Sequence, residues 1–360
     1  MVLMALDHVR DFVTNQRFPP EDLSRATAGL FATRWVTHFC APAFSLLAGV
    51  GIGLALQRRG NAAQMSRFLV TRGLWLVFLD LTISAIGFQL SLQLIPAFAL
   101  VLWALGWSMV VMAALIHLPR PLVLVLSLLT IAGHNLLDGV RGSGLWNVLH
   151  VPGFAIPGVL FVAYPLIPWV AVMALGYVLA DVYQWEGARR RRFLIASGLA
   201  ATALFVGIRA LNGYGDPAPW TGQRSPALTV ASFLNVRKYP PSLDFLLMTL
   251  GPTLVMLALV EGAKSTLARW VSVYGQVPLF YYMAHIYVAH VVAMLLALVQ
   301  GGELRRIPVL SDPGSMPTWY GVPLPGVYLA WALVVVLLYV PCRWYARLKS
   351  RRNDWWLRYT

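Results

Sequence analysis

Long apolar runs alternate with short polar connections along almost the whole chain. Most runs are close to the roughly 20 residues that a helix needs to cross the hydrocarbon core of a bilayer. We expect about ten spans, at residues 1–13, 35–56, 68–88, 94–116, 122–137, 154–182, 193–211, 243–260, 271–298 and 326–340. The pattern predicts an all-α, polytopic integral membrane helical bundle that forms one transmembrane domain over residues 1–360.

The first apolar run differs from the others because it is short. Residues 1–13 are followed at once by the polar loop TNQRFPPEDLSRATAG. This length favours a first helix that is truncated at its inner end. Thr27 has the character of an N-cap, so the loop at 14–34 is expected to include a surface helix.

Composition places the chain among membrane proteins and gives its basic residues a topological meaning. Hydrophobic residues make up 59% of the chain and charged residues only 12%, which excludes an ordinary soluble domain. The net charge of +14 sits in short connections and in a basic, aromatic tail at 341–360. Most of the 28 Lys and Arg lie on the side of that tail, which predicts cytoplasmic termini and excludes nucleic acid as a partner. The expected partner is the lipid bilayer.

Small and sulfur-containing residues add little chemistry. Cys40 and Cys342 belong to different spans, so a disulfide framework is not expected. Gly49, Gly51 and Gly53 form the motif GVGIG within a span, which predicts close helix packing rather than a phosphate loop, since no strand precedes it.

Ionisable residues in the first two spans are the main functional signal. The first carries Asp7, His8, Arg10 and Asp11, and the second carries His38. Such groups cost about 2.5 kcal/mol or more at membrane depth, so they tend to mark function. His8, Asp7 and His38 are therefore the candidate catalytic residues.

Further polar residues lie in the middle or outer part of other spans, which suggests a shared cavity that opens outward. The candidate acceptor or supporting residues are His134, Asn135, Asp138, Lys238, Tyr239, His285 and His290. His134 and Asp138 have i, i+4 spacing, and a helix-end hydrogen-bonded pair explains them as well as a site does. Packing against neighbouring helices is the simpler interpretation of His285 and His290. The histidines are scattered with few carboxylates, so no metal is expected.

Several stretches together resemble one family. MVLMALDHVRDF, TRWVTHFCAPAFSLLAG, GHNLLD, KYPPSLDFLLMTLGP and VPLFYYMAHIYVAH make the chain similar to bacterial membrane proteins related to heparan-α-glucosaminide N-acetyltransferase, within the transmembrane acyltransferase superfamily. The resemblance implies an enzyme of the bacterial inner membrane that takes an acetyl or other acyl group from cytoplasmic acyl-CoA. The acceptor would be a sugar or glycan on the extracytoplasmic side.

The resemblance turns the candidate residues into a hypothesis. His8, oriented by Asp7 or His38, would act as general base on an acceptor hydroxyl or amine. The anionic phosphates of acetyl-CoA would meet Arg58, Arg59, Arg67, Arg189 or Arg190 at the inner face.

Two alternatives stay open at this point. In a proton-coupled secondary transporter, Asp7, His8 and His134 would relay protons. A degenerate, non-catalytic scaffold is the third option. The sequence also leaves the acceptor, the acyl chain and the oligomeric state open, with a homo-oligomer among the options.

Overall fold

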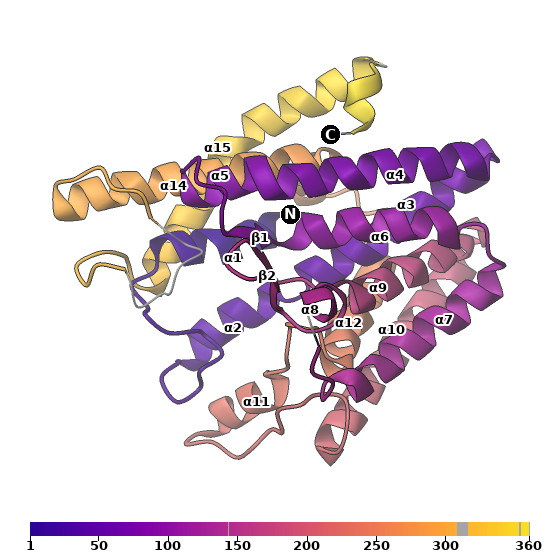
Figure 1. Ribbon diagram of the computed structural model, residues 1–360, viewed down its shortest axis with the longest axis horizontal. Helices are drawn as coiled ribbons and strands as arrows, with labels where there is room; N and C mark the ends of the chain where they lie inside the picture. The colour runs from indigo at the N-terminus through magenta and orange to yellow at the C-terminus, as the bar shows by residue number, and fades with distance from the viewer. Residues whose placement is uncertain (143, 308–315, 353, 360) are drawn as a thin grey trace. The chain divides into compact units, whose positions relative to one another are not determined.

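The computed structural model describes residues 1–142, 144–307, 316–352 and 354–359 (Figure 1). The chain forms two compact units. Unit 1 comprises Met1–Cys40, Thr82–Leu94 and Ala263–Thr360, and unit 2 comprises Ala41–Leu81 and Ile95–Gly262. A short π-helix, η1 (Asp80–Ser84), contains the point at which the chain passes from unit 2 to unit 1.

Unit 1 is built around the first helix of the chain, α1 (Val2–Val13). This helix packs against α14 (Pro278–Gly301) and α15 (Leu324–Arg351) and also contacts α2 (Ala28–Thr37). The unit also contains α5 (Ala85–Gln89), α13 (Thr266–Gln276) and η5 (Trp355–Arg358). The side chain of Thr27 accepts a hydrogen bond from the Leu30 amide, which confirms the predicted N-cap.

Unit 2 contains the remaining helices and a small sheet. Its helices are α3 (Cys40–Arg59), α4 (Ala62–Leu79), α6 (Val101–Leu115), α7 (Arg120–Gly133), η2 (His134–Leu137), α8 (Gly144–Leu149), α9 (Leu166–Leu179), η3 (Ala180–Gln184), α10 (Gly187–Leu211), α11 (Pro226–Leu234) and α12 (Leu243–Val260). The strands are β1 (Ala97–Ala99), β2 (Gly153–Ile156) and β3 (Leu160–Val162), in the order β1-β3-β2. β3 is parallel to β1 and antiparallel to β2.

Glycines let the helices of unit 2 approach each other closely. Figure 1 shows α4 and α6 side by side, and a Cβ added at Gly73 or at Gly106 would lie 2.5 Å from the other residue's carbonyl oxygen. α3 and α9 meet in the same way, since a Cβ at Gly49 would lie 1.9 Å from the Met173 carbonyl oxygen. Close packing at the GVGIG motif is thus confirmed at Gly49 and at Gly53.

The part of the chain that the structure describes contains eight helical stretches long and apolar enough to cross a bilayer. They are Ala28–Arg58, Ala62–Gln89, Arg120–Leu137, Leu166–Gln184, Gly187–Leu211, Leu243–Val260, Pro278–Gly301 and Leu324–Arg351. The other two expected spans correspond to the shorter helices α6 and α1. The protein is therefore an integral membrane protein with a helical bundle fold.

Three expected span boundaries were wrong. The run at 94–116 begins with β1, and the run at 154–182 begins with strand pairing and becomes helical only at Leu166. The prolines and glycines of this segment disfavour a helix. The run at 271–298 contains two helices, because Pro278 has no amide hydrogen and begins a new helix after α13.

Candidate functional site

A pair of histidines in unit 1 joins α1 to α14. Ala5, Val9 and Phe12 form the fully buried face of α1, and this packing turns His8 towards α14. Nδ1 of His8 lies 2.7 Å from Nε2 of His285. The two rings are stacked, with centroids 5.0 Å apart and planes 15° apart. The structure therefore gives His8 a direct partner that the sequence interpretation assigned to packing.

The second nitrogen of His285 defines the protonation pattern of this pair. Nδ1 of His285 lies 3.0 Å from the Tyr281 carbonyl oxygen, which can only accept a hydrogen bond. Nδ1 of His285 therefore carries the proton, and in a neutral ring Nε2 accepts from Nδ1–H of His8. This assignment leaves the lone pair of a neutral His8 on Nε2.

Asp7 belongs to a network of carboxylates and guanidinium groups. Its two oxygens lie 2.9 Å from Nη2 of Arg10 and 2.5 Å from Nη1 of Arg34. Nη2 of Arg10 also lies 2.6 Å from Asp11, and Nε of Arg34 lies 2.6 Å from Glu21. Two guanidinium groups thus bridge three carboxylates, which ties α1 to α2 and to the loop between them.

His38 approaches this network through Glu21. Its side chain is buried, and Nε2 lies 3.9 Å from Oε1 of Glu21. Burial raises the pKa of the Glu21 carboxyl, but the charge of the Arg34 guanidinium, its hydrogen bond and the nearby His38 ring outweigh burial and hold the pKa below its ordinary value. Glu21 is therefore ionised at neutral pH. His38 thus lies beside the charged network, whereas Nδ1 of His8 is hydrogen-bonded to His285.

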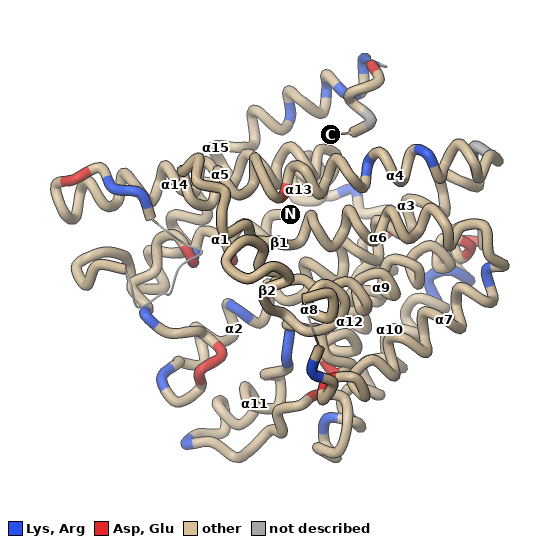
Figure 2. Tube along the Cα trace, in the orientation of Figure 1, with Lys and Arg blue, Asp and Glu red and all other residues tan. Residues whose placement is uncertain are grey.

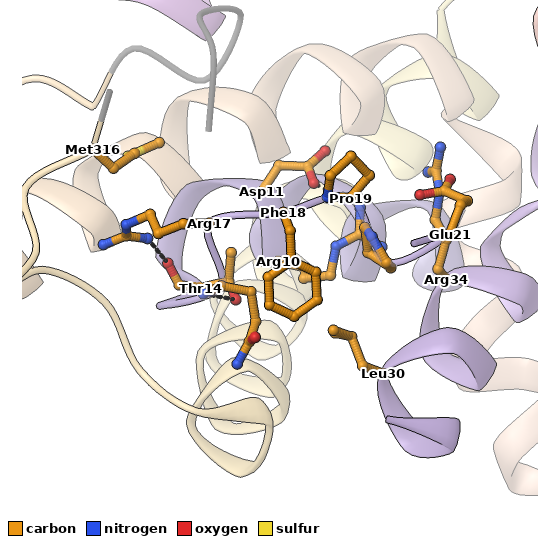
Figure 3. A pocket seen from close by; sticks show the side chains of 12 residues that line it. Arg10, Asp11, Thr14, Arg17, Phe18, Pro19, Glu21, Leu30, Arg34 and Met316 are labelled. Atoms are coloured by element: carbon orange, nitrogen blue, oxygen red, sulfur yellow. Dashed lines mark hydrogen bonds and ion pairs between the residues drawn. The ribbon is translucent and has the colours of Figure 1, made fainter. Parts of the chain in front are cut away.

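The charged network borders a cavity of about 270 Å³ (Figure 3). Arg10, Asp11, Glu21 and Arg34 contribute charged side chains, and Phe18 contributes an aromatic ring. The remaining lining residues are Thr14, Gln16, Arg17, Pro19, Pro20, Leu30 and Met316. The cavity therefore offers hydrogen-bond donors and acceptors beside an apolar wall, which is the composition of a site for a small polar ligand.

Arg17 holds the loop that forms one wall of this cavity. Its guanidinium donates to the carbonyl oxygens of Thr14, Pro317 and Tyr320 at 3.0, 2.8 and 2.5 Å. Burial lowers the pKa of this guanidinium from its ordinary value, but not enough to discharge it at neutral pH. Sequence reasoning missed Arg17, because an arginine in a polar loop carries no signal of the carbonyl groups that it binds.

His290 has a structural role in unit 1. Nδ1 lies 3.0 Å from the Gly87 carbonyl oxygen, and Nε2 accepts from the Ile307 amide at 3.1 Å. Both ring nitrogens are thus used by the backbone. These contacts are of the kind that the packing interpretation expects, and they tie α14 to α5 and to the segment after α14.

In unit 2, the end of α7 and the residue after α8 form a second polar cluster. Nε2 of His150 donates to Oδ1 of Asp138 at 2.9 Å. The ring centres of His134 and His150 lie 5.6 Å apart. One imidazole nitrogen of each histidine and one carboxylate oxygen of Asp138 all lie within 4.8 Å of one another. Asn135 donates to Oδ2 of Asp138 and accepts from the Leu243 amide. His150 is not among the residues predicted from sequence, because nothing in the spacing relates it to His134.

Lys238 and Tyr239 form a separate group in unit 2. Nζ of Lys238 lies 5.1 Å from the centre of the Tyr239 ring and 5.9 Å from that of Tyr164. The two tyrosine hydroxyls lie 3.3 Å apart. Cation–π contacts thus hold the ammonium group of Lys238, which is buried.

The arginines predicted to bind the donor all belong to unit 2. Arg58, Arg67 and Arg189 are exposed, whereas Arg190 donates to Glu261 and to the carbonyl oxygens of Tyr183 and Trp185. The hydrogen bond from Arg190 lowers the pKa of Glu261. The side chain of Arg59 lies outside the described part of the structure. Arg190 is thus engaged in a structural tie, and the guanidinium of Arg189 lies over the Trp185 ring, 4.4 Å from its centre.

The charged ends of several helices meet near these arginines. Gln57 donates to Asp181 at 2.8 Å, and Arg120 at the start of α7 forms an ion pair with the same carboxylate. These contacts bring the end of α3, the start of α7 and η3 together. In unit 2, blue and red segments lie mostly at helix ends and in loops (Figure 2).

Comparison with known proteins finds a matching family model. Residues 1–214 match the family model described as heparan-alpha-glucosaminide N-acetyltransferase, catalytic. No curated protein and no solved structure matched the chain.

Proposed function

Because the chain belongs to the family of heparan-alpha-glucosaminide N-acetyltransferase catalytic domains, we propose that it transfers an acetyl or related acyl group across the bacterial inner membrane. The donor is acyl-CoA in the cytoplasm, and the acceptor is a sugar or glycan on the extracytoplasmic side. Both termini face the cytoplasm, as the distribution of Lys and Arg indicates.

The observation that carries the proposal is the hydrogen bond between His8 and His285. It orients Nδ1–H of His8 and leaves the lone pair on Nε2, which is the state that a general base requires. His8 Nε2 takes the proton of an acceptor amine or hydroxyl as that group attacks the thioester carbonyl. The carbon–sulfur bond then breaks and the thiolate of CoA leaves. In this scheme His285 positions His8, in place of Asp7 or His38.

The cavity in unit 1 is the proposed acceptor site. His8 does not line it, but Asp11, about one helical turn further along α1, does, so the reacting group of the acceptor is proposed to extend past Asp11 to His8. A glucosamine unit presents hydroxyl and amino groups, which the carboxylates of Asp11 and Glu21 and the guanidinium of Arg34 can pair. The volume of the cavity, about 270 Å³, is just below the roughly 300–1,000 Å³ of common small-molecule pockets. We therefore expect a single sugar ring to enter it. Asp7 and His38 would then shape the cavity through the ion-pair network.

Exposed arginines at the helix ends of unit 2 are the proposed contacts for the anionic part of the donor. Arg58, Arg67 and Arg189 are accessible, and guanidinium groups suit phosphate. Arg190 would support them by holding the start of α10 to Glu261.

The test uses purified protein in proteoliposomes with acyl-labelled acetyl-CoA outside or inside and glucosamine in the other compartment. We expect labelled N-acetylglucosamine, and His8→Ala should lower its rate by about 10²–10⁴-fold, the usual contribution of a general base. His117→Ala is the matched control, because His117 is exposed and the hydrogen bond of its ring among the described residues is to Ser66. Normal turnover in His8→Ala would refute the role of His8.

The same vesicles distinguish the enzyme from a transporter. Proton-coupled uptake of a solute in the absence of CoA, without label transfer from acetyl-CoA, would favour the transporter hypothesis. Transfer of label to the sugar excludes transport as the main function.

A further inference from the structure

Two buried histidines and one partly exposed carboxylate of unit 2 converge just after α7. His134 begins η2, Asp138 follows its last residue, and His150 follows α8. His134 is 2% exposed and His150 is fully buried. One ligand atom from each of the three residues lies within 4.8 Å of the other two.

The ring nitrogens of His134 lack protein partners. Neither Nδ1 nor Nε2 of this buried side chain has a hydrogen-bond partner among the described residues. Buried polar atoms in native proteins are almost always satisfied, so unsatisfied ones at one place point to a bound group that completes them. A cation that takes imidazole nitrogen explains this better than a hydrogen-bonded pair, because the pair of His150 and Asp138 leaves His134 unsatisfied.

The carboxylate of this cluster is already oriented. Asn135 donates to Oδ2 of Asp138 at 2.9 Å, and its own oxygen accepts from the Leu243 amide at 2.8 Å. The start of α12 therefore holds Asn135, and Asn135 holds Asp138 with Oδ1 towards His150. Metal-binding carboxylates are commonly oriented by an outer hydrogen bond of this kind.

We propose that His134, Asp138 and His150 form a binding site for Zn²⁺ or a similar first-row transition metal ion. Two imidazoles and one carboxylate suit these metals, whereas Ca²⁺ and Mg²⁺ prefer oxygen ligands throughout. Three protein ligands leave a fourth position of a tetrahedral ion for water. Binding through Nε2 of His150 replaces its hydrogen bond to Asp138, and the proton moves to Nδ1 so that the ring stays neutral.

The spacing of the ligand atoms is close to what a metal ion requires. Ligands of a tetrahedral zinc ion with bonds of about 2.1 Å lie about 3.4 Å apart. His150 Nε2 and Asp138 Oδ1 lie 2.9 Å apart, and no separation in the set exceeds 4.8 Å. An ion bound here would move His150 and Asp138 slightly apart. The ion would connect the end of α7 to the segment before β2.

The proposal is independent of acyl transfer and is tested by metal content. The full chain, without a polyhistidine tag, is purified in detergent from zinc-containing medium and analysed by inductively coupled plasma mass spectrometry. We expect about one zinc ion per chain, and loss of most of it in His134→Ala and in His150→Ala. His117→Ala is the matched control and should keep its zinc. Asn135→Ala should weaken zinc affinity by about 10–100-fold, because it keeps all three ligands but removes the hydrogen bond that orients Asp138, together with the bond from the Leu243 amide.

Thermal unfolding gives a second measurement that does not depend on the variants. A chelator should lower the Tm of the unmodified protein, and added Zn²⁺ should restore it with a saturable dependence on concentration. Titration of the chelated protein with Co²⁺ should produce the visible absorption of a four-coordinate ion. Zinc content equal in His134→Ala and the unmodified protein, or a Tm and spectrum that do not respond to metal, would overturn the proposal.

Discussion

The histidine pair of unit 1 can be tested by removing the nitrogens of its supporting ring. His285→Phe keeps an aromatic ring that can stack on His8 but removes the acceptor at 2.7 Å. His8 is then no longer held in one tautomer or orientation. We expect a lower kcat for acetyl transfer with little change in KM for acetyl-CoA.

The hydrogen bond itself indicates the size of the effect. A net contribution of about 0.5–1.5 kcal/mol per hydrogen bond corresponds to a rate change of about 2- to 13-fold. Loss of the correct tautomer adds to this. The total loss should stay below the roughly 10²–10⁴-fold expected for removal of the base itself.

His290→Phe is a matched control on the same helix. His290 is fully buried like His285, but its nitrogens bond to the Gly87 carbonyl oxygen and the Ile307 amide. Its loss leaves two buried backbone groups without their partners, at about 1–3 kcal/mol each, so Tm should fall while kcat is retained.

A double variant separates positioning from a general loss of structure. If His285 acts only through His8, His8→Ala with His285→Phe should be as slow as His8→Ala alone. The assay is label transfer from acetyl-CoA to glucosamine, with Tm measured in parallel. Additive losses, or an equal loss of kcat in His290→Phe, would refute the reasoning.

The class of fold could be predicted from sequence because it follows from the length of the apolar runs. The span boundaries were wrong where an apolar run does not correspond to a single helix. Residues 154–162 are apolar enough to extend a span, yet they form β2 and β3 next to a proline- and glycine-containing turn. Hydropathy measures transfer from water, and it does not distinguish a strand pair from a helix.

The candidate residues could be found from sequence, but their partners could not. Asp7 and His8 stood out because charge within an apolar helix is costly. Neighbours on a helix are about 100° apart, however, so Asp7 turns to Arg10 and Arg34 while His8 turns to His285, which is 277 residues away. The approach of two distant helices fixes such a pair, and no local spacing encodes it.

Three further predictions concern packing, donor binding and pH. Gly49→Ala should lower Tm strongly because its Cβ would meet the Met173 carbonyl oxygen, whereas Gly51→Ala should be tolerated, since no described atom lies within 4 Å of its added Cβ. Arg189→Ala should raise KM for acetyl-CoA, because it removes a proposed donor contact. Arg190→Ala should chiefly lower Tm, because Arg190 is bonded to Glu261. A raised KM in Arg190→Ala with a lowered Tm in Arg189→Ala would contradict the proposed donor contacts. Glu21→Gln should lower stability by about 1–2 kcal/mol near pH 7, a value between those of exposed and buried ion pairs. The folded-state pKa of Glu21 lies below its unfolded value, so this contribution is fully present above the unfolded value of about 4.3 and is lost as the pH falls towards the folded value. Tm of the unmodified protein and of Glu21→Gln is measured from pH 8 down to about pH 4. The two Tm values should differ by a constant amount until the lowest pH values, where the difference begins to shrink. A difference in Tm that already vanishes near pH 6 would show that Arg34 does not hold this carboxyl in its ionised form.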